Sequence, residues 1–154
     1  MRMKAYRKIG VLLLILLVVS QFIQPKRNTS ATIITENDIS KVYAMPNDLH
    51  QVLINKCYDC HSNNTRYPWY FYIQPIGWWL AAHVHEGKEE LNFSEFRSYD
   101  QKKTDHKLEE LEEVTEDRSM PLKAYTLFHE EAKITEEDEQ MIKGWLSSLK
   151  PAAN

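Results

Sequence analysis

The chain has 154 residues, enough for one domain, and 43% of them are hydrophobic, which suits a globular core. Charged residues make up 27%, too many for a polytopic membrane protein, and the net charge of −3 lacks the basic excess typical of nucleic-acid-binding proteins. Two cysteines exclude a scaffold held together by several disulfides.

The chain begins with a basic cluster that is followed by an uncharged run rich in Leu and Val over residues 9–23. Such a run fits a membrane-spanning helix with local thinning of the bilayer, or the hydrophobic region of a signal peptide. No A-x-A-like cleavage site follows, so we expect an uncleaved anchor over residues 1–24. The basic residues should stay in the cytoplasm while the rest is exported; they are Arg2, Lys4, Arg7 and Lys8.

Residues 25–41 are polar, rich in Thr and without clear periodicity, and are interpreted as a tether. The globular domain is then expected over residues 42–150. Apolar residues at helical spacing predict a helix over 48–59 with Asn47 as its N-cap, and another over 76–90 that starts after Pro75. The second helix carries an apolar stripe of Ile76, Leu80, Val84 and Leu91, which also holds His83 and Gly87.

Two further helices are expected in the second half of the chain. Residues 105–116 are acidic and helical in pattern, and a break with Pro121 follows over 118–122. Thr135 and Asp138 resemble a capping box in front of a helix with a buried stripe that includes Trp145. Because no alternating strand pattern is present, the predicted class is all-α, a small helical domain behind an N-terminal transmembrane helix.

The strongest local motif is Cys57-Tyr58-Asp59-Cys60-His61, which has the C-x-x-C-H spacing of c-type haem attachment. Two thiols three residues apart can form thioethers to the two haem vinyl groups, and the histidine that follows is then held beneath the iron as an axial ligand. We therefore expect one covalently bound haem c per chain at Cys57, Cys60 and His61.

Three other interpretations of the cysteine pair are weaker. A thioredoxin-like redox pair would need a surrounding βαβ pattern, which is missing. A zinc site would need a second paired cluster. A disulfide between Cys57 and Cys60 would close a loop too short to stabilise the fold.

Met120 is the preferred candidate for the sixth iron ligand. It lies 59 residues after His61, beside Pro121 and off any apolar stripe, and a thioether is a suitable axial ligand. His83 and His129 are the competing ligands, and an open iron position is a further alternative. The remaining histidines, His50, His85 and His106, fall on polar faces and are expected to be exposed to solvent.

Aromatic residues are dense over residues 67–72 and at Trp78 and Trp79. They suggest a wall around the haem, with Arg66 near the propionates. Ordinary core packing by aromatic side chains is the alternative, and both can hold at once.

The sequence resembles the haem-binding domain family of exported, often membrane-anchored bacterial proteins. The resemblance rests on C-Y-D-C-H-S at 57–62, Y-P-W-Y at 67–70, H-E-G-K-E-E-L-N-F-S-E at 85–95, M-P at 120–121, Y-T-L-F-H-E-E-A at 125–132, and Trp145. It implies covalent haem at Cys57 and Cys60 with His61 as axial ligand. It also implies a bacterial envelope setting, and we expect a single-pass inner-membrane protein whose haem domain faces the periplasm.

The expected function is that of a membrane-anchored periplasmic monohaem cytochrome that carries single electrons between envelope redox partners and is not an enzyme. A haem with both axial positions filled by protein side chains binds substrate poorly. The alternatives are a haem-based sensor or ligand-binding module, and a haem peroxidase with an open sixth position. No nucleic-acid partner is expected.

Overall fold

The computed structural model describes the backbone of residues 2–150 and the side chains of residues 5–150. Over these residues the regular structure is entirely helical, which confirms the all-α prediction. The α-helices are α1 (Arg2–Ser20), α2 (Ile39–Val42), α3 (Asn47–Lys56), α4 (Tyr58–His61), α5 (Ile76–Glu90), α6 (Gln101–Glu116), α7 (Lys123–Thr126) and α8 (Glu136–Leu149). Three short 3₁₀ helices lie between them: η1 (Trp69–Tyr72), η2 (Phe93–Ser98) and η3 (Glu130–Ala132).

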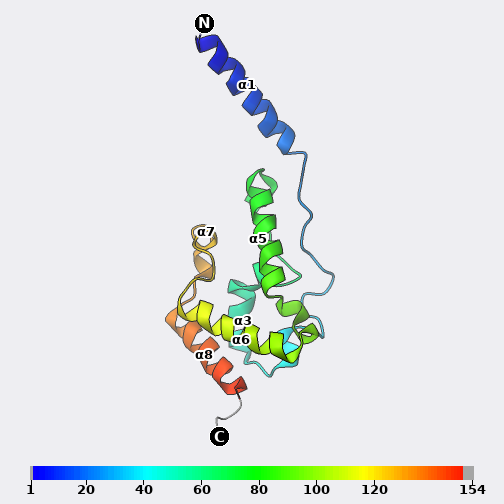
Figure 1. Cartoon of the computed structure of the whole chain (residues 1–154), viewed down its shortest axis with the longest axis vertical. Coiled ribbons are helices and arrows are strands. Elements are labelled where there is room, and N and C mark those ends of the chain that lie inside the picture. The colour runs from blue at the N-terminus through cyan, green and yellow to red at the C-terminus, as the bar shows by residue number, and fades with distance from the viewer. Residues whose placement is uncertain (1, 151–154) are drawn as a thin grey trace.

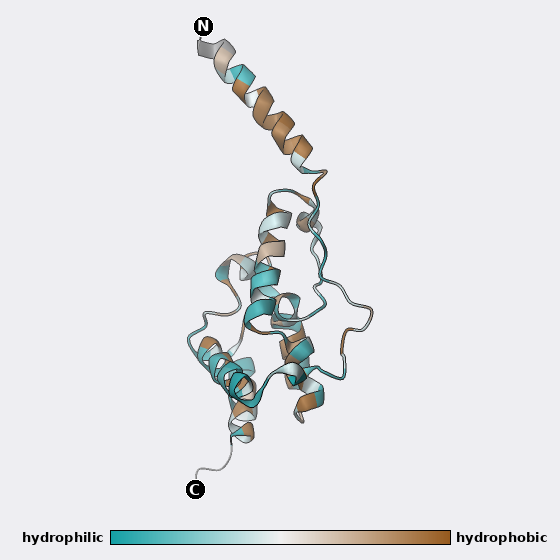
Figure 2. Ribbon diagram, turned by 45° about the vertical axis from the view of Figure 1, so that its right-hand side comes forward, coloured by the Kyte–Doolittle hydropathy of each residue, from teal (hydrophilic) through white to brown (hydrophobic). Residues whose placement is uncertain are grey.

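Helix α1 stands apart from the other helices, and α1 and α8 lie at opposite ends of the molecule (Figure 1). The second half of α1 is apolar around its whole circumference (Figure 2). Among the described residues, no helix combines the length and apolar character needed to cross a membrane.

The segment expected to be a tether lies along the domain over much of its length. Asn28 accepts a hydrogen bond at its carbonyl from the Thr65 amide (3.0 Å) and donates its own amide to the Tyr67 hydroxyl (2.7 Å). Further along, the Thr35 hydroxyl donates to the Ser94 carbonyl, and Ile39 is fully buried in the core. Residues 28–39 are therefore integrated into the fold.

The N-terminal end of α3 differs from the expectation. The helix begins at Asn47 itself, and Pro46 occupies the capping position without a side-chain hydrogen bond, so the prediction of Asn47 as N-cap is wrong. Proline suits this position because its amide nitrogen carries no hydrogen to be satisfied. The helix ends at Lys56, and Cys57 forms a kink (φ −122°, ψ −38°) before the single turn of α4.

The start of α8 agrees with the prediction. The Thr135 side chain accepts from the Asp138 amide, and the Asp138 carboxylate accepts from the Thr135 amide, which is a complete capping box. Ile142, Trp145 and Leu146 are buried on one face of this helix. The Trp145 indole donates to the Ala44 carbonyl over 3.0 Å, which satisfies its only polar group and connects α8 to the segment between α2 and α3.

The main core lies between α3, α4, η2, α6 and α8. Its buried side chains include Leu49, Leu53, Tyr58, Phe93, Phe96, Leu111, Ile142 and Leu146. The Tyr58 ring stacks on Phe93 with centroids 5.1 Å apart, and its hydroxyl donates to the buried Asp38 carboxylate. Tyr58 lies between the two cysteines in the chain, so its packing attaches the cysteine-containing turn to the core.

Helix α5 begins directly after Pro75, as predicted, and packs against η1 and α4. Leu80 and Val84 are buried, whereas Ile76 is 44% exposed, so the predicted stripe is not buried over its whole length. Gly77 permits the contact with η1: a Cβ there would lie 2.0 Å from the Phe71 carbonyl oxygen. In the first turn of α5, Gly77 is therefore buried while Trp78 and Trp79 remain partly exposed.

Candidate functional site

A cavity of about 480 Å³ lies between α4, α5 and the segment that leads into α7. This volume falls within the range of roughly 300–1,000 Å³ that is usual for cofactor sites. Three stretches of chain line it: Lys56, Cys57, Asp59, Cys60 and His61; His83, Glu86, Gly87 and Glu90 from α5; and Met120, Pro121, Leu122 and Tyr125. All four predicted site residues, Cys57, Cys60, His61 and Met120, therefore face one cavity.

Both cysteines are free thiols that are partly buried at the cavity wall. Burial raises the pKa of the Cys57 thiol to about 12 and that of Cys60 to about 11. A reactive redox cysteine has a lowered pKa instead, because the thiolate is its nucleophilic form. The neutral thiols do not fit the thioredoxin-like alternative.

His61 follows directly from the cysteine-bearing turn and is held by one ring nitrogen. Its Nδ1 donates to the Leu91 carbonyl over 3.0 Å, which fixes the tautomer and leaves Nε2 unprotonated as a possible ligand atom. Burial lowers the pKa of His61, partly offset by hydrogen bonds to backbone carbonyls, so the ring is neutral near pH 7. A neutral imidazole oriented by a backbone carbonyl is the usual arrangement of a histidine that binds a metal.

Gly87 brings α5 close to the turn that carries the cysteines. A Cβ at this position would lie 2.9 Å from the Cys60 carbonyl oxygen and 3.3 Å from the Cys60 Cβ. Only glycine fits this approach without displacing the backbone of the turn. The absence of a side chain at Gly87 thus allows α5 to pack directly against the turn that carries Cys60.

Met120 and His83 both face the cavity from elements other than α4. Met120 is 37% exposed, in the break between α6 and α7, and its amide donates to the Val114 carbonyl over 3.4 Å. His83 lies on α5, where its Nδ1 donates to the Trp79 carbonyl over 2.9 Å. The structure brings both candidates for the sixth ligand to the same cavity.

A buried carboxylate links the cysteine turn to two other segments. Asp59 accepts hydrogen bonds from the Arg66 guanidinium (3.0 Å) and from the Tyr125 hydroxyl (3.0 Å). Hydrogen bonding to Asp59 raises the pKa of Arg66, and burial together with the Asp59 charge raises the pKa of Tyr125 well above its ordinary value. Arg66 is outside the cavity lining, so the expectation that it lies beside haem propionates is not supported.

The other histidines occupy different environments. His129 stacks on Tyr125 (centroids 4.3 Å apart) and forms a hydrogen bond of 2.6 Å with the Tyr70 hydroxyl, and it lies outside the cavity lining. His50 is half-buried against Tyr58, so the prediction that it is exposed is wrong. His85 and His106 are exposed, as predicted, and each pairs with a glutamate one turn later.

The aromatic block does not form the cavity wall that the sequence suggested. None of the residues 67–72, nor Trp78 or Trp79, lines the cavity among the described residues. Phe71 is buried, but Trp69, Tyr72, Trp78 and Trp79 are exposed. Tyr125 contributes an aromatic side chain to the cavity lining instead. No local pattern predicts its hydrogen bond to Asp59, which lies 66 residues earlier in the chain.

Among the described residues, no group of three or more His, Cys, Asp and Glu side chains is arranged to hold a metal ion by itself. The site consists instead of two thiols, two imidazoles and a thioether around one partly open cavity, a donor set suited to an iron that arrives within an organic ring. The residues therefore fit a haem group.

Comparison with protein-family models gives a match to the haem-binding domain over residues 15–148. This match includes every residue that lines the cavity. No curated protein and no solved structure matches the chain significantly.

Proposed function

This chain belongs to the haem-binding domain family, and we propose that it is a monohaem c-type cytochrome that carries single electrons at a bacterial membrane. The observation that supports this proposal best is the common cavity lined by Cys57, Cys60, His61 and Met120. Bound there, haem would supply one-electron oxidation and reduction of its iron.

The two thiols would attach the group covalently. Each thiol would hold the haem by adding across one of its two vinyl groups, with the sulfur on the inner carbon and the thiol hydrogen on the outer carbon, so the attachment would need no oxidant or reductant. His61 would bind the iron through Nε2 while the Leu91 carbonyl holds its other nitrogen.

Electron transfer follows from occupation of both axial positions by protein side chains. Met120 is our preferred sixth ligand because a thioether favours the reduced iron and raises the potential. His83 is the competing ligand from α5. An iron without a sixth ligand would favour the second candidate function, a module that binds a gaseous ligand, or a peroxidase.

We further propose that the uncharged run over residues 9–23, which continues past the end of α1, anchors the protein in the inner membrane with the haem domain in the periplasm, and that local thinning of the bilayer compensates for the shortness of α1. Its apolar half follows a basic N-terminal cluster, which favours a cytoplasmic N-terminus. A reporter fused after Asn154 that is active only outside the cytoplasm should then give a signal. Activity of a cytoplasm-only reporter at the same point would reverse the orientation.

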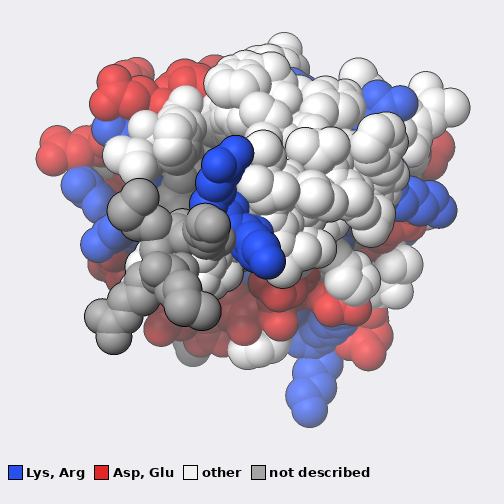
Figure 3. Space-filling model, turned by 90° about the horizontal axis from the view of Figure 1, so that it is seen from above, with Lys and Arg blue, Asp and Glu red and all other residues white. Residues whose placement is uncertain are grey.

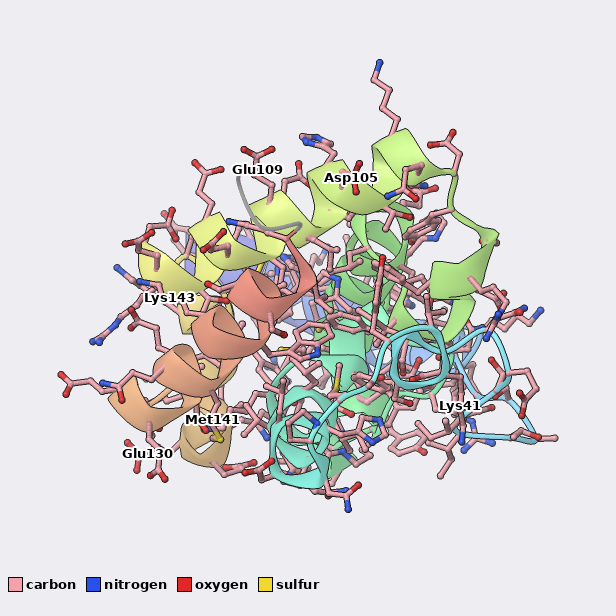
Figure 4. All side chains as sticks on the ribbon, turned by 90° about the horizontal axis from the view of Figure 1, so that it is seen from below. Lys41, Asp105, Glu109, Glu130, Met141 and Lys143 are labelled. Carbon is pink, nitrogen blue, oxygen red and sulfur yellow. The ribbon has the colours of Figure 1, made fainter. Side chains whose placement is uncertain are left out.

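Redox partners would meet an acidic surface. Helices α6 and α8 carry many glutamates, and the side chains of Asp105, Glu109 and Glu130 point outward when the molecule is seen from below (Figure 4). Such a face attracts a basic partner electrostatically, and added salt reduces the range of this attraction.

The deciding experiment is a visible spectrum of the full-length protein matured in an envelope with a haem-attachment system. Acid-acetone extraction should leave the haem on the polypeptide, and the reduced protein should not bind carbon monoxide. Haem that extracts freely would refute covalent attachment. Rapid carbon monoxide binding at rest would favour the sensor or peroxidase function over electron transfer.

A further inference from the structure

The end of the domain nearest α1 exposes a group of aromatic and aliphatic side chains. This aromatic end consists of Tyr72 and Ile73 at the end of η1, and Ile76, Trp78 and Trp79 in the first turn of α5, all between 38% and 49% exposed. No Asp, Glu, Lys or Arg occurs between Arg66 and Glu86. Two adjacent indoles on a projecting helix end are an unusual surface for a water-exposed domain, and such patches indicate a contact with another apolar phase.

The aromatic end is joined to the residues that directly follow α1. The Trp78 indole nitrogen donates to the Ile23 carbonyl over 2.7 Å. Gln21 donates to the Gln74 carbonyl and accepts from the Gln74 amide (2.9 Å). These bonds hold the last residues of the apolar run beside the first turn of α5.

Phe22 and Ile23 extend this apolar surface, because the Trp78 bond holds Ile23 beside the aromatic end. Their side chains are 84% and 60% exposed. A bilayer that takes up the apolar run 9–23 would therefore reach its boundary at the level of Trp78. Lys26 and Arg27 follow after two uncharged residues, are exposed, and form no ion pair with any described residue.

The distribution of acidic side chains also distinguishes the end of the molecule near α1 from the opposite end. Seen from above, along α1, the surface is largely uncharged and the acidic side chains lie mainly at its margins (Figure 3). The acidic side chains of α6 lie on the opposite end of the molecule (Figure 4). The aromatic end contains no Asp or Glu, so it carries no negative charge that anionic lipid would repel.

We propose that the aromatic end docks into the headgroup region of the same bilayer that α1 enters. Tryptophan and tyrosine concentrate at this depth because each has an apolar ring and a polar group that stays hydrated. Lys26 and Arg27 would lie among the lipid phosphates. This inference rests on the proposed membrane role of α1, and it adds that the haem domain is held at a fixed orientation on the surface.

The test uses the full-length holoprotein labelled with 5-fluorotryptophan in phospholipid bicelles. The four tryptophans give four fluorine resonances, which single Trp→Phe variants assign. A lipid with a gadolinium chelate on its headgroup should broaden the resonances of Trp78 and Trp79 relative to its diamagnetic lutetium analogue. Trp145, buried in α8 at the far end, should keep its linewidth.

A pair of variants checks the contact itself. Ile76→Glu places a charge in the aromatic end and should abolish the broadening of Trp78 and Trp79. Leu127→Glu, at a 73% exposed residue outside the aromatic end, should leave it unchanged. Equal broadening in both variants would refute docking by these residues.

Flotation of the same protein with liposomes separates the two proposals. Protein that floats but shows no broadening of Trp78 and Trp79 refutes docking and leaves the anchor intact. Protein that does not float refutes both. Resonances of Trp78 and Trp79 that shift with protein concentration, without broadening, would assign the aromatic end to a second copy of the chain instead.

Discussion

The Tyr125 hydroxyl donates a hydrogen bond of 3.0 Å to the carboxylate of Asp59, the residue immediately before the second cysteine. Tyr125 belongs to α7, which follows the break that carries Met120, so this bond fastens the Met120 side of the cavity to the cysteine side. The Arg66 guanidinium, from a third segment of the chain, donates to the same carboxylate. One buried carboxylate thus joins the two sides of the cavity to each other and to the segment that carries Arg66.

Loss of this bond should loosen the segment that carries Met120. The Tyr125→Phe variant removes one hydrogen bond to a charged group, which is worth about 1.5–3 kcal/mol. We expect the sulfur–iron charge-transfer band of the oxidised protein to disappear at a lower urea concentration than in the wild type. Tyr72→Phe, at an exposed tyrosine whose hydroxyl has no partner among the described residues, is the matched control and should not change that concentration.

The cysteines make separable contributions to haem attachment. Cys57→Ala or Cys60→Ala alone should leave one thioether, and acid-acetone extraction should still leave haem on the chain. The double variant should release all haem on extraction. A double variant that keeps haem bound through extraction would disprove attachment at these thiols.

The sixth ligand can be decided by two substitutions of residues that face the same cavity. Met120→Ala should abolish the charge-transfer band, open the iron to carbon monoxide and lower the reduction potential, because sulfur favours the reduced iron. His83→Ala should leave the band in place. If His83→Ala gives a high-spin spectrum while Met120→Ala does not, the iron has two histidine ligands.

Two glycines allow a matched test of how α5 meets the cysteine turn. Gly87→Ala puts a Cβ within 2.9 Å of the Cys60 carbonyl oxygen and should destabilise the protein by about 1–3 kcal/mol, the usual cost of overpacking. In α8, a Cβ added at Gly144 would meet no atom of another element within 4 Å. Gly144→Ala should therefore stabilise the protein by up to about 1 kcal/mol through helix propensity. Urea unfolding measures both, and equal effects would mean that α5 can retreat without loss.

Acid should weaken the connection between α3 and α8. Lys56 pairs with Asp138 over 2.7 Å, and both side chains are largely buried. Burial alone would raise the pKa of Asp138, but hydrogen bonds from Lys56 and Thr135 outweigh it and hold this pKa below its ordinary value. A lowered folded-state pKa contributes stability that is present above the unfolded pKa, near 3.9, and is lost as the pH falls through the folded value.

The corresponding measurement compares wild type with Asp138→Asn by urea unfolding at pH 7 and at pH 3. The wild type should be more stable by about 1–3 kcal/mol at pH 7, and the difference should shrink at pH 3. Glu137→Gln, at an exposed neighbour in the same helical turn, should show little difference at either pH. A difference that is independent of pH would mean that the charge of Asp138 is unimportant.

Local signals in the sequence predicted the helices and the cysteine motif well. The capping box at Thr135 and the start of α5 after Pro75 each depend on residues within one helical turn, so they can be recognised without tertiary structure. The kink at Cys57 could not be predicted in this way, because the pattern of apolar residues continues through it.

Contacts between residues far apart in the chain could not be predicted from local sequence patterns. The link from Asp59 to Tyr125 spans 66 residues, and hydrogen bonds fix the segment around Asn28, where polar residues show no periodicity. The aromatic block was misassigned to the haem wall because aromatic density is the same signal for a core, a cofactor wall and a surface. Only the fold distinguishes the exposed Trp79 from the buried Phe71.

The attachment of residues 28–39 along the domain determines how far the haem can travel. A free chain over residues 24–37 would have an end-to-end distance of roughly 20 Å and a maximum reach of roughly 48 Å. Hydrogen bonds from Asn28 and Thr35 to the domain remove that slack. For a protein anchored through α1, the partner must diffuse to the haem along the membrane, since the haem cannot swing out to the partner.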